Sequence, residues 1–524
     1  MSDLIQKGFA ALQAGRKLEA LEIARKADGD PNAKYLEGLA LRAMGESEAA
    51  LGAFKVLSLT HPLVPDFPNL EGLCHGDLGE VDLAVMAFEK ALSANPKYIH
   101  AAFNLGRMLA ANGRLKSAVT AYRRALSIDP NHLPSRRNLA FVLDQMHEPE
   151  AAEKEADAAL QLSYSDPLAL TVKASALIQR EAYGEAAELV TKRLAKDAPP
   201  VNASLALGKK GEALEKAGEY EAAFAAWQQA NQRLKAEFTS AYVNVTNGFS
   251  LQRVRELARW PGLDIAPEAG LTGPAPVFLV GFPRSGTTLM ENVLAAHPDV
   301  VTSDEAALSP PLIEAAGDTP DDWVKFLDTM ADNRAGLRET YWAGWKGKPV
   351  KPGQVFIDKL PLNLAYAGLL AAVFPDAKFI LALRDPRDCV LSAFKQRFGM
   401  NPAMFQMLSM PGASAYYDAA MTAGMRALDR LPPARLMQVR YEDFVADLEG
   451  QARQLTGFLG LDWTDEVMRY RDKAKARPVS TPSAPQIVQP VYESSAGRWR
   501  DYAGALEAVR GKLDPWATRF GYEA

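Results

Sequence analysis

The stretch of this chain most suited to holding an anion is a glycine-bounded loop, "FPRSGTT" at residues 282–288. It follows an apolar run and precedes a helical pattern that starts near Thr287, so backbone N–H groups and the positive end of a helix dipole would face the anion. Loops that bind nucleoside triphosphates carry a lysine where Thr287 stands, whereas Arg284 offers a forked donor inside this loop. The loop therefore fits a shorter anionic chain than a triphosphate. The alternative is a degenerate loop that binds nothing.

A second candidate anion site lies in "KFILALRDPRDCVLSAF", residues 378–394. Arg384 ends an apolar strand pattern, and Ser392 follows in the helix after an Asp-Pro turn. Taken alone, an arginine at a strand end is more often a surface or ion-pair residue. Together with the first loop, however, this pair indicates a nucleotide phosphorylated on both its 5′ and 3′ sides.

The two motifs, in this order, closely resemble the cofactor signatures of sulfotransferases, and within that superfamily the chain is most similar to the tyrosylprotein sulfotransferases. The resemblance covers residues 275 to 500. It implies 3′-phosphoadenosine-5′-phosphosulfate (PAPS) as co-substrate and no metal. The chain departs from the family pattern at Gln396, where those enzymes have an arginine. We also expect neither their secretory targeting nor their disulfides, so the resemblance does not identify peptide tyrosine as the acceptor.

The resemblance also implies a role for individual residues. It places five loop residues on the cofactor: Arg284, Ser285, Gly286, Thr287 and Thr288. It assigns four more residues to the nucleotide or its phosphates: Arg384 and Ser392 at the 3′-phosphate, Tyr441 beside the nucleotide, and Arg498 where the family has a lysine. It gives three residues catalytic positions: Glu305 as the base, Lys359 at the leaving oxygen, and Ser483 near the transferring group.

The chemistry of sulfuryl transfer requires a base for the acceptor hydroxyl and a cation for the departing phosphate oxygen. The only histidine in the second half, His297, lies in "HPD" between a helix and the next strand and is interpreted as structural. A carboxylate must then serve. Glu305 is the best placed and Asp304 the fallback, although either could cap a helix instead. Lys359 follows "VFID" at a strand end, where it would point into the site, although a surface lysine is the alternative.

Alternating strand and helix patterns follow a proline- and glycine-rich segment that ends the first half of the chain near residue 262. Runs such as "PVFLVG", "NLAYAGLLAAVFPD" and "KFILALRD" predict a parallel sheet whose ligand lies at the carboxyl ends of the strands. We therefore expect an α/β, P-loop-like parallel-sheet domain over 275–524, preceded by a capping helix and linker over 241–274.

The first half repeats every 34 residues, as Gly38, Gly72 and Gly106 show. This period is the tetratricopeptide (TPR) signature, and about seven units predict an all-α solenoid over 1–240. Its concave face is expected to bind the acceptor or a protein partner, with a purely structural arm as the alternative. Asn104 and Asn138, which share one repeat position, could hold a peptide there, although such residues are also common as solvated repeat filler.

Composition excludes several classes of function. A net charge of −5 and a pI near 5.9 give no reason to expect nucleic acid as a partner. The two cysteines provide neither a disulfide framework nor a metal cluster, and they favour a reducing compartment. The first twenty residues resemble neither a signal peptide nor a membrane anchor. We expect a cytoplasmic protein with no membrane span, and a homodimer is left open.

Three functions remain compatible with the sequence. The leading one is sulfuryl transfer from PAPS to a hydroxyl of a protein, peptide, glycan or small molecule. The second is a nucleotide-dependent kinase, which should carry a loop lysine and magnesium-binding acids. The third is a TPR scaffold protein whose transferase domain is inactive.

Overall fold

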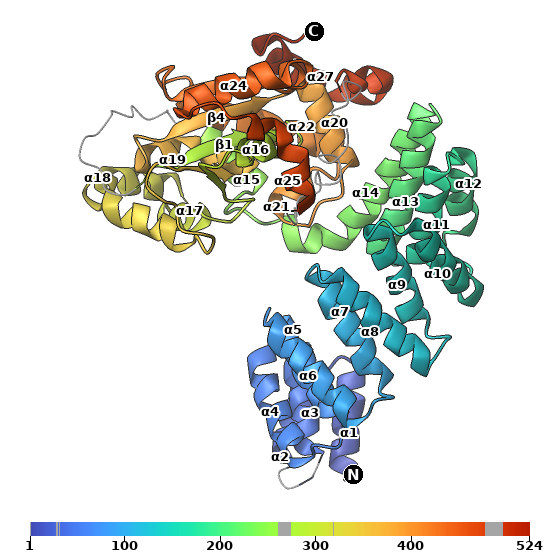
Figure 1. Ribbon diagram of the computed structural model, residues 1–524. Coiled ribbons are helices and arrows are strands. Elements are labelled where there is room, and N and C mark those ends of the chain that lie inside the picture. The colour runs from blue at the N-terminus through green and yellow to red at the C-terminus, as the bar shows by residue number, and fades with distance from the viewer. Residues whose placement is uncertain are drawn as a thin grey trace. The chain divides into compact units, whose positions relative to one another are not determined.

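The computed structural model describes residues 2–27, 30, 32–259, 274–317, 319–476 and 496–523 (Figure 1). The chain forms two compact units, Met1–Gly218 and Glu219–Ala524. The division falls before residue 240, so the last helix that the sequence assigns to the repeats belongs to the second unit. Among the described helices, none is long and apolar enough to span a bilayer.

The described part of the first unit consists of helices, which follow one another in pairs as the 34-residue period predicts. They are α1 (Asp3–Gln13), α2 (Lys17–Lys26), α3 (Ala33–Met44), α4 (Ser47–Thr60), α5 (Asp66–Asp77), α6 (Val81–Ala94), α7 (Ile99–Ala111), α8 (Leu115–Ile128), α9 (Leu133–Gln145), α10 (Pro149–Leu162), α11 (Pro167–Gln179), α12 (Tyr183–Arg193) and α13 (Pro200–Lys216).

The repeated glycines lie where the two helices of a pair touch. A Cβ on Gly72 would lie 2.6 Å from a ring carbon of Phe88, and a Cβ on Gly106 would lie 2.6 Å from a ring carbon of Tyr122. No real Cβ tolerates such a distance, so only glycine lets the helices approach this closely. This packing confirms the interpretation of the period.

The second unit alternates strands and helices around one sheet. Its elements are α14 (Tyr220–Tyr242), α15 (Leu251–Arg259), β1 (Val277–Gly281), α16 (Thr287–Ala295), β2 (Val300–Thr302), α17 (Pro310–Ala315), α18 (Pro320–Ala343), β3 (Val355–Lys359), η1 (Pro361–Tyr366), α19 (Ala367–Val373), β4 (Lys378–Leu383), α20 (Pro386–Lys395), α21 (Pro402–Gln406), α22 (Met410–Leu428), β5 (Leu436–Arg440), α23 (Tyr441–Ala446), α24 (Leu448–Leu459), η2 (Asp465–Arg469), α25 (Tyr470–Ala476), η4 (Arg498–Tyr502) and α27 (Ala503–Arg519).

The sheet is parallel throughout, with strand order β2-β3-β1-β4-β5. The central strand β1 pairs with β3 and β4, so that Val277 lies opposite Ile357 on one side and Lys378 on the other. Parallel neighbours end at the same edge of a sheet. The loop after β1, the end of β3 and the turn after β4 therefore meet at one edge, and the expected α/β class is confirmed.

Successive residues of β1 face two different cores, as the pleat requires. Val277 and Leu279 join a buried cluster with Val293 and Leu294 of α16. The intervening Phe278 packs instead against the rings of Tyr341, Phe374 and Phe379, which α18, the α19–β4 region and β4 supply. Both faces of the sheet are thus covered at β1, which explains why this strand is a continuous apolar run.

Helix α14 carries repeat-like residues but packs on the C-terminal end of α20. Phe224 stacks on Phe394 with ring centroids 5.0 Å apart, and Asn231 Nδ2 donates to the Phe394 carbonyl at 2.8 Å. Trp227, 4% exposed, lies under the ammonium of Lys395, which is 4.5 Å from its ring centroid. The helix is therefore part of the α/β unit's own structure.

Replacement of Trp227 by alanine should destabilise the α/β unit by about 3–5 kcal/mol, because a buried aromatic ring and its cation contact are both lost. The adjacent Gln228 is exposed, and Gln228→Ala should change the unfolding free energy by less than about 0.5 kcal/mol. Denaturant unfolding of the two variants checks this. Equal, small effects would mean that α14 adds little to the unit.

Candidate functional site

The loop between β1 and α16 has an unusual backbone. Arg284 and Gly286 both have left-handed conformations, with φ of 75° and 95°. A Cβ on Gly286 would lie 2.5 Å from Cδ2 of Tyr441, the first residue of α23. Glycine at this position is thus required both by the backbone angle and by the close approach of the tyrosine ring. Helix α16 begins at Thr287, as the sequence predicts.

The structure brings the two predicted anion motifs together. Arg284 Nε donates to Ser392 Oγ at 3.0 Å, and Arg384 Nη1 donates to the Arg284 carbonyl at 3.1 Å. The guanidinium of Arg384 lies 5.0 Å from the ring centroid of Tyr441. Four residues that the sequence assigned to the cofactor, from three separate segments, therefore form one connected group at the carboxyl edge of the sheet.

The electrostatics of this group favour an anion. Burial, and after it the nearby charge of Arg384, lower the pKa of Arg284 to about 10. An anion placed beside two close guanidinium groups would relieve their repulsion. Within the described part of the chain, the Oγ of Ser285, a residue only 1% exposed, has no hydrogen-bond partner. An orphaned buried hydroxyl in the same loop as Arg284 fits a phosphate-type ligand.

Lys359, at the end of β3, lies between two carboxylates. Its Nζ donates to Glu305 Oε1 at 2.7 Å and lies 3.2 Å from Glu291 Oε2. Lys359 is fully buried and the Glu291 side chain is 2% exposed, whereas the Glu305 side chain is 35% exposed. The sequence predicted Lys359 and Glu305 as partners in catalysis, and the structure places them in contact. Glu291 was missed, because a lone acidic residue in the apolar run of α16 has the same pattern whether it faces solvent or a buried lysine.

A buried hydrogen-bond network around Asp358, the residue before Lys359 in β3, supports the position of the lysine. Asp358 accepts hydrogen bonds from Tyr341 Oη at 2.7 Å, Ser303 Oγ at 3.2 Å and Asn363 Nδ2 at 3.3 Å. The Lys359 backbone N–H donates in turn to Ser303 Oγ at 3.0 Å. Desolvation raises the pKa of Asp358 to about 6 despite these donors. The network fixes the end of β3 and therefore the direction in which the lysine leaves it.

The remaining predicted site residues have different surroundings. Thr287 and Thr288 are buried in the first turn of α16. Arg498 pairs with Asp501 at 3.3 Å and lies 5.6 Å from the ring centroid of Tyr220. These contacts differ from those of Arg284 and Arg384. Ser483 lies outside the described residues.

Two other polar residues of the α/β unit, His297 and Asp388, have defined hydrogen-bond partners. The Nε2 of His297 lies 2.9 Å from the Asp462 carbonyl and its Nδ1 accepts the Asp299 N–H, which agrees with the structural role predicted for it. Asp388, in α20, accepts the backbone N–H groups of Gly497 and Trp499 at 2.6 and 2.7 Å. Asp388 stands in the first turn of α20, where its sequence position does not distinguish it from a helix-capping acid.

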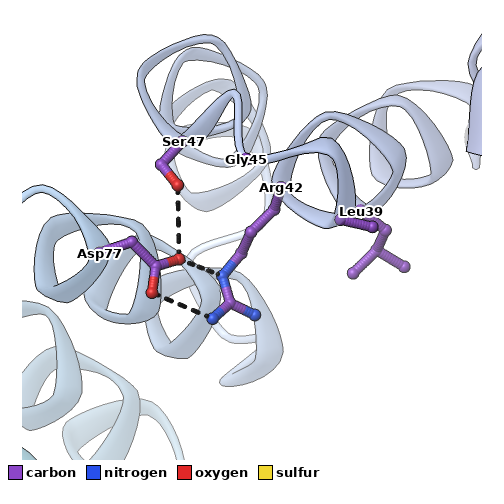
Figure 2. A pocket seen from close by; sticks show the side chains of 6 residues that line it. Leu39, Arg42, Gly45, Ser47 and Asp77 are labelled. Carbon is purple, nitrogen blue, oxygen red and sulfur yellow. Dashed lines mark hydrogen bonds and ion pairs between the residues drawn. The ribbon is translucent and has the colours of Figure 1, made fainter. Parts of the chain in front are cut away.

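A separate cavity of about 530 Å³ occurs in the repeat unit (Figure 2). It is lined by Leu39, Arg42, Ala43, Gly45, Ser47 and Asp77. Arg42 pairs with Asp77 at 2.8 Å, and Ser47 Oγ donates to the same carboxylate at 3.4 Å. Its only cation is thus already neutralised, and the cavity contains none of the predicted site residues. The described residues contain no cluster of three or more histidine, cysteine or acidic ligands for a metal.

The two asparagines predicted to line the concave repeat face each bond to another side chain of the repeats. Asn104 Nδ2 donates to Asn69 Oδ1 at 2.9 Å, and Asn138 Nδ2 donates to Tyr122 Oη at 3.4 Å. A role for them in holding a peptide stays a prediction.

Comparison with known proteins agrees with both halves of this description. The Sulfotransferase family matches residues 276–465, and Tetratricopeptide repeat families match residues 69–132 and 109–176. The solved structure MamA MSR-1 C2 is 25% identical, with a TM-score of 0.27, over 31% of this chain and 95% of its own. The predicted combination of a sulfotransferase domain with TPR repeats is confirmed.

Several curated proteins are similar to this chain over about half of its length. The protein-tyrosine sulfotransferase of Drosophila melanogaster is 26% identical over 47% of this chain and 51% of its own length. Protein-tyrosine sulfotransferase 1 of Danio rerio is 29% identical over 47% of this chain and 72% of its own. An uncharacterized protein of Aquifex aeolicus is 28% identical over 56% of this chain and 39% of its own length. The chain thus spans about half or less of the first and third of these relatives.

Gly286→Ala should destabilise the protein more than Gly460→Ala, which provides a matched control. Both glycines have left-handed backbone, with φ of 95° and 80°, but a Cβ on Gly460 would meet nothing within 4 Å. Each variant pays about 1 kcal/mol of backbone strain. Gly286→Ala must also displace Tyr441, which should add about 1–3 kcal/mol. Denaturant unfolding measures the difference, and equal losses would contradict the close approach of Tyr441.

Proposed function

Because the chain carries a sulfotransferase domain with TPR repeats, we propose that it transfers the sulfuryl group of PAPS to a hydroxyl acceptor. The observation that carries this proposal is the connected group of Arg284, Arg384 and Ser392 beside the unpartnered Ser285 hydroxyl. It supplies an anion site at the carboxyl edge of the sheet without the lysine of a triphosphate loop.

Under this proposal, one set of residues binds PAPS and a second set carries out the transfer. PAPS supplies an activated sulfuryl group on a phosphate leaving group. The loop residues, with Arg384 and Ser392, hold the phosphates, and Tyr441 lies beside the nucleotide. Glu305, the more exposed carboxylate, takes the proton of the acceptor hydroxyl. Lys359 directs its ammonium at the leaving oxygen. The roles predicted for Ser483 and Arg498 are retained as part of the proposal.

The acceptor is a hydroxyl of a peptide tyrosine, a glycan or a small molecule. The names of the Drosophila and Danio relatives favour tyrosine as the first acceptor to try. We assign the TPR repeats to binding the acceptor or a partner protein, since stacked helical repeats provide an extended surface for peptides. The location that we propose is the cytoplasm, and the buried free thiols of Cys74 and Cys389 suit its reducing conditions.

Calorimetric titration with 3′-phosphoadenosine-5′-phosphate, the desulfated donor, tests the proposal directly. Without magnesium, we expect clear binding of this bisphosphate and much weaker binding of ATP. Two anion sites match its two phosphates, whereas no loop lysine reaches the end of a triphosphate. Tighter binding of ATP would favour the kinase instead. No binding of either nucleotide would favour the TPR scaffold with an inactive domain.

Variants of the two groups of residues should separate binding from chemistry. Arg384→Ala should weaken bisphosphate affinity by about 10- to 100-fold, since it removes a charge-assisted contact. Lys359→Ala should leave that affinity within about threefold but lower the rate of transfer by about 10²- to 10³-fold, and Glu305→Ala should do the same. Lys351→Ala, at an exposed lysine, is the matched control and should change neither quantity. Equal loss of affinity in all three variants would contradict the assignment.

A further inference from the structure

Glu291 is a buried carboxylate with no role in the mechanism above. It lies in α16, one helical turn after Thr287 and Thr288 of the anion loop. Its side chain is 2% exposed. Burying a carboxylate costs several kcal/mol unless its charge is balanced and its oxygens are bonded. The contacts of its two oxygens therefore indicate why an acidic residue occupies this position.

The first oxygen holds a strained turn. Glu291 Oε1 accepts the backbone N–H of Asp304 at 3.2 Å. Asp304 and Glu305 both have left-handed backbone, with φ of 49° and 64°. Two successive non-glycine residues in this conformation cost about 1–3 kcal/mol each and persist only where the surroundings hold them. Glu291 thus helps to hold the turn that presents Glu305.

The second oxygen faces the catalytic cation. Glu291 Oε2 lies 3.2 Å from Lys359 Nζ, an ion pair whose angles are not those of a hydrogen bond. Glu305 approaches the same ammonium at 2.7 Å from the exposed side. One cation is therefore shared by two carboxylates, of which only Glu305 is accessible to an acceptor.

We propose that Glu291 is a positioning residue, a buried counter-charge that holds the Lys359 ammonium in place while Glu305 changes its charge. This inference rests on the proposed function. In the transfer step, the acceptor oxygen bonds to sulfur while its proton moves to Glu305. The bond between sulfur and the 5′-phosphate oxygen breaks, and its electron pair stays on that oxygen, beside the Lys359 ammonium.

The charges explain why a second carboxylate is needed. When Glu305 becomes neutral, Lys359 still faces Glu291, so a buried ammonium is not left without a counter-charge. Before the step, Glu291 and Glu305 share the same ammonium, so Glu305 is not its only counter-charge. Burial raises the pKa of Glu291, Asp304 adds to this effect and Lys359 opposes it. Its ionised state therefore depends on the lysine that it holds.

Glu291→Gln separates the two contacts. The amide oxygen of glutamine can still accept the Asp304 N–H, but the side chain has no charge for Lys359. Transfer from PAPS, followed as sulfate released to water and as sulfation of a tyrosine peptide, should be about 10- to 100-fold slower. Bisphosphate affinity should be unchanged or greater, because a negative charge near the phosphate site has been removed. A lower rate together with undiminished affinity is not what structural damage would produce.

Two further variants complete the test. Glu291→Leu removes both contacts and should lose more activity than Glu291→Gln. Glu314→Gln makes the same chemical change at an exposed residue of α17 and should behave as the unmodified protein.

The outcomes distinguish this inference from the proposed function. A Glu291→Gln variant that transfers at the unmodified rate would overturn the positioning role and leave the proposed function intact. A variant that loses rate and bisphosphate affinity in parallel would show that Glu291 is only structural, which also overturns the role. If the unmodified protein neither binds the bisphosphate nor releases sulfate from PAPS, the proposed function fails and this inference fails with it.

Discussion

The parallel register of β1 between β3 and β4 is the constraint on which the site depends. Val277 lies opposite both Ile357 and Lys378, so the three strands run in step to one edge. That edge receives the glycine-bounded loop, the ammonium of Lys359 and the guanidinium of Arg384 from segments far apart in the chain. Buried apolar side chains on both faces of the sheet fix this register. The charged groups at the strand ends are therefore held at the same edge.

The charged groups at this edge form two clusters, one at the loop after β1 and one at the end of β3. At the loop, one guanidinium lies close to another, and burial and this neighbour lower the pKa of Arg284, a cost that an anionic ligand would offset. At the end of β3, the ammonium of Lys359 is already matched by Glu305 and Glu291. An anionic ligand would therefore be stabilised at the loop, whereas the Lys359 ammonium already has two carboxylates as partners.

Local patterns in the sequence were enough to predict the repeats, the parallel sheet, and the position of both anion motifs at the carboxyl ends of its strands. Each of these follows from periodicity or from the rule that parallel strands end together. Glu291 was not predictable in the same way, because an acidic residue within a short helix has the same pattern whether it faces solvent or a buried lysine. The same holds for the asparagines of the repeats. Asn104 has a polar neighbour, Asn69, that only tertiary structure reveals.

Helix α14 shows why a sequence boundary and a folding boundary need not coincide. Its small and aromatic residues continue the repeat pattern, yet Phe224 and Trp227 pack on the end of α20, the helix that carries Ser392. A repeat helix has one apolar stripe. The hydrophobic periodicity of the sequence predicts that this stripe is buried, but it does not predict which element covers it. Here the partner is the helix that supports the second anion motif. The α/β unit therefore includes a helix that periodicity alone assigns to the repeats, and α20 is held in part by residues that the family resemblance does not cover.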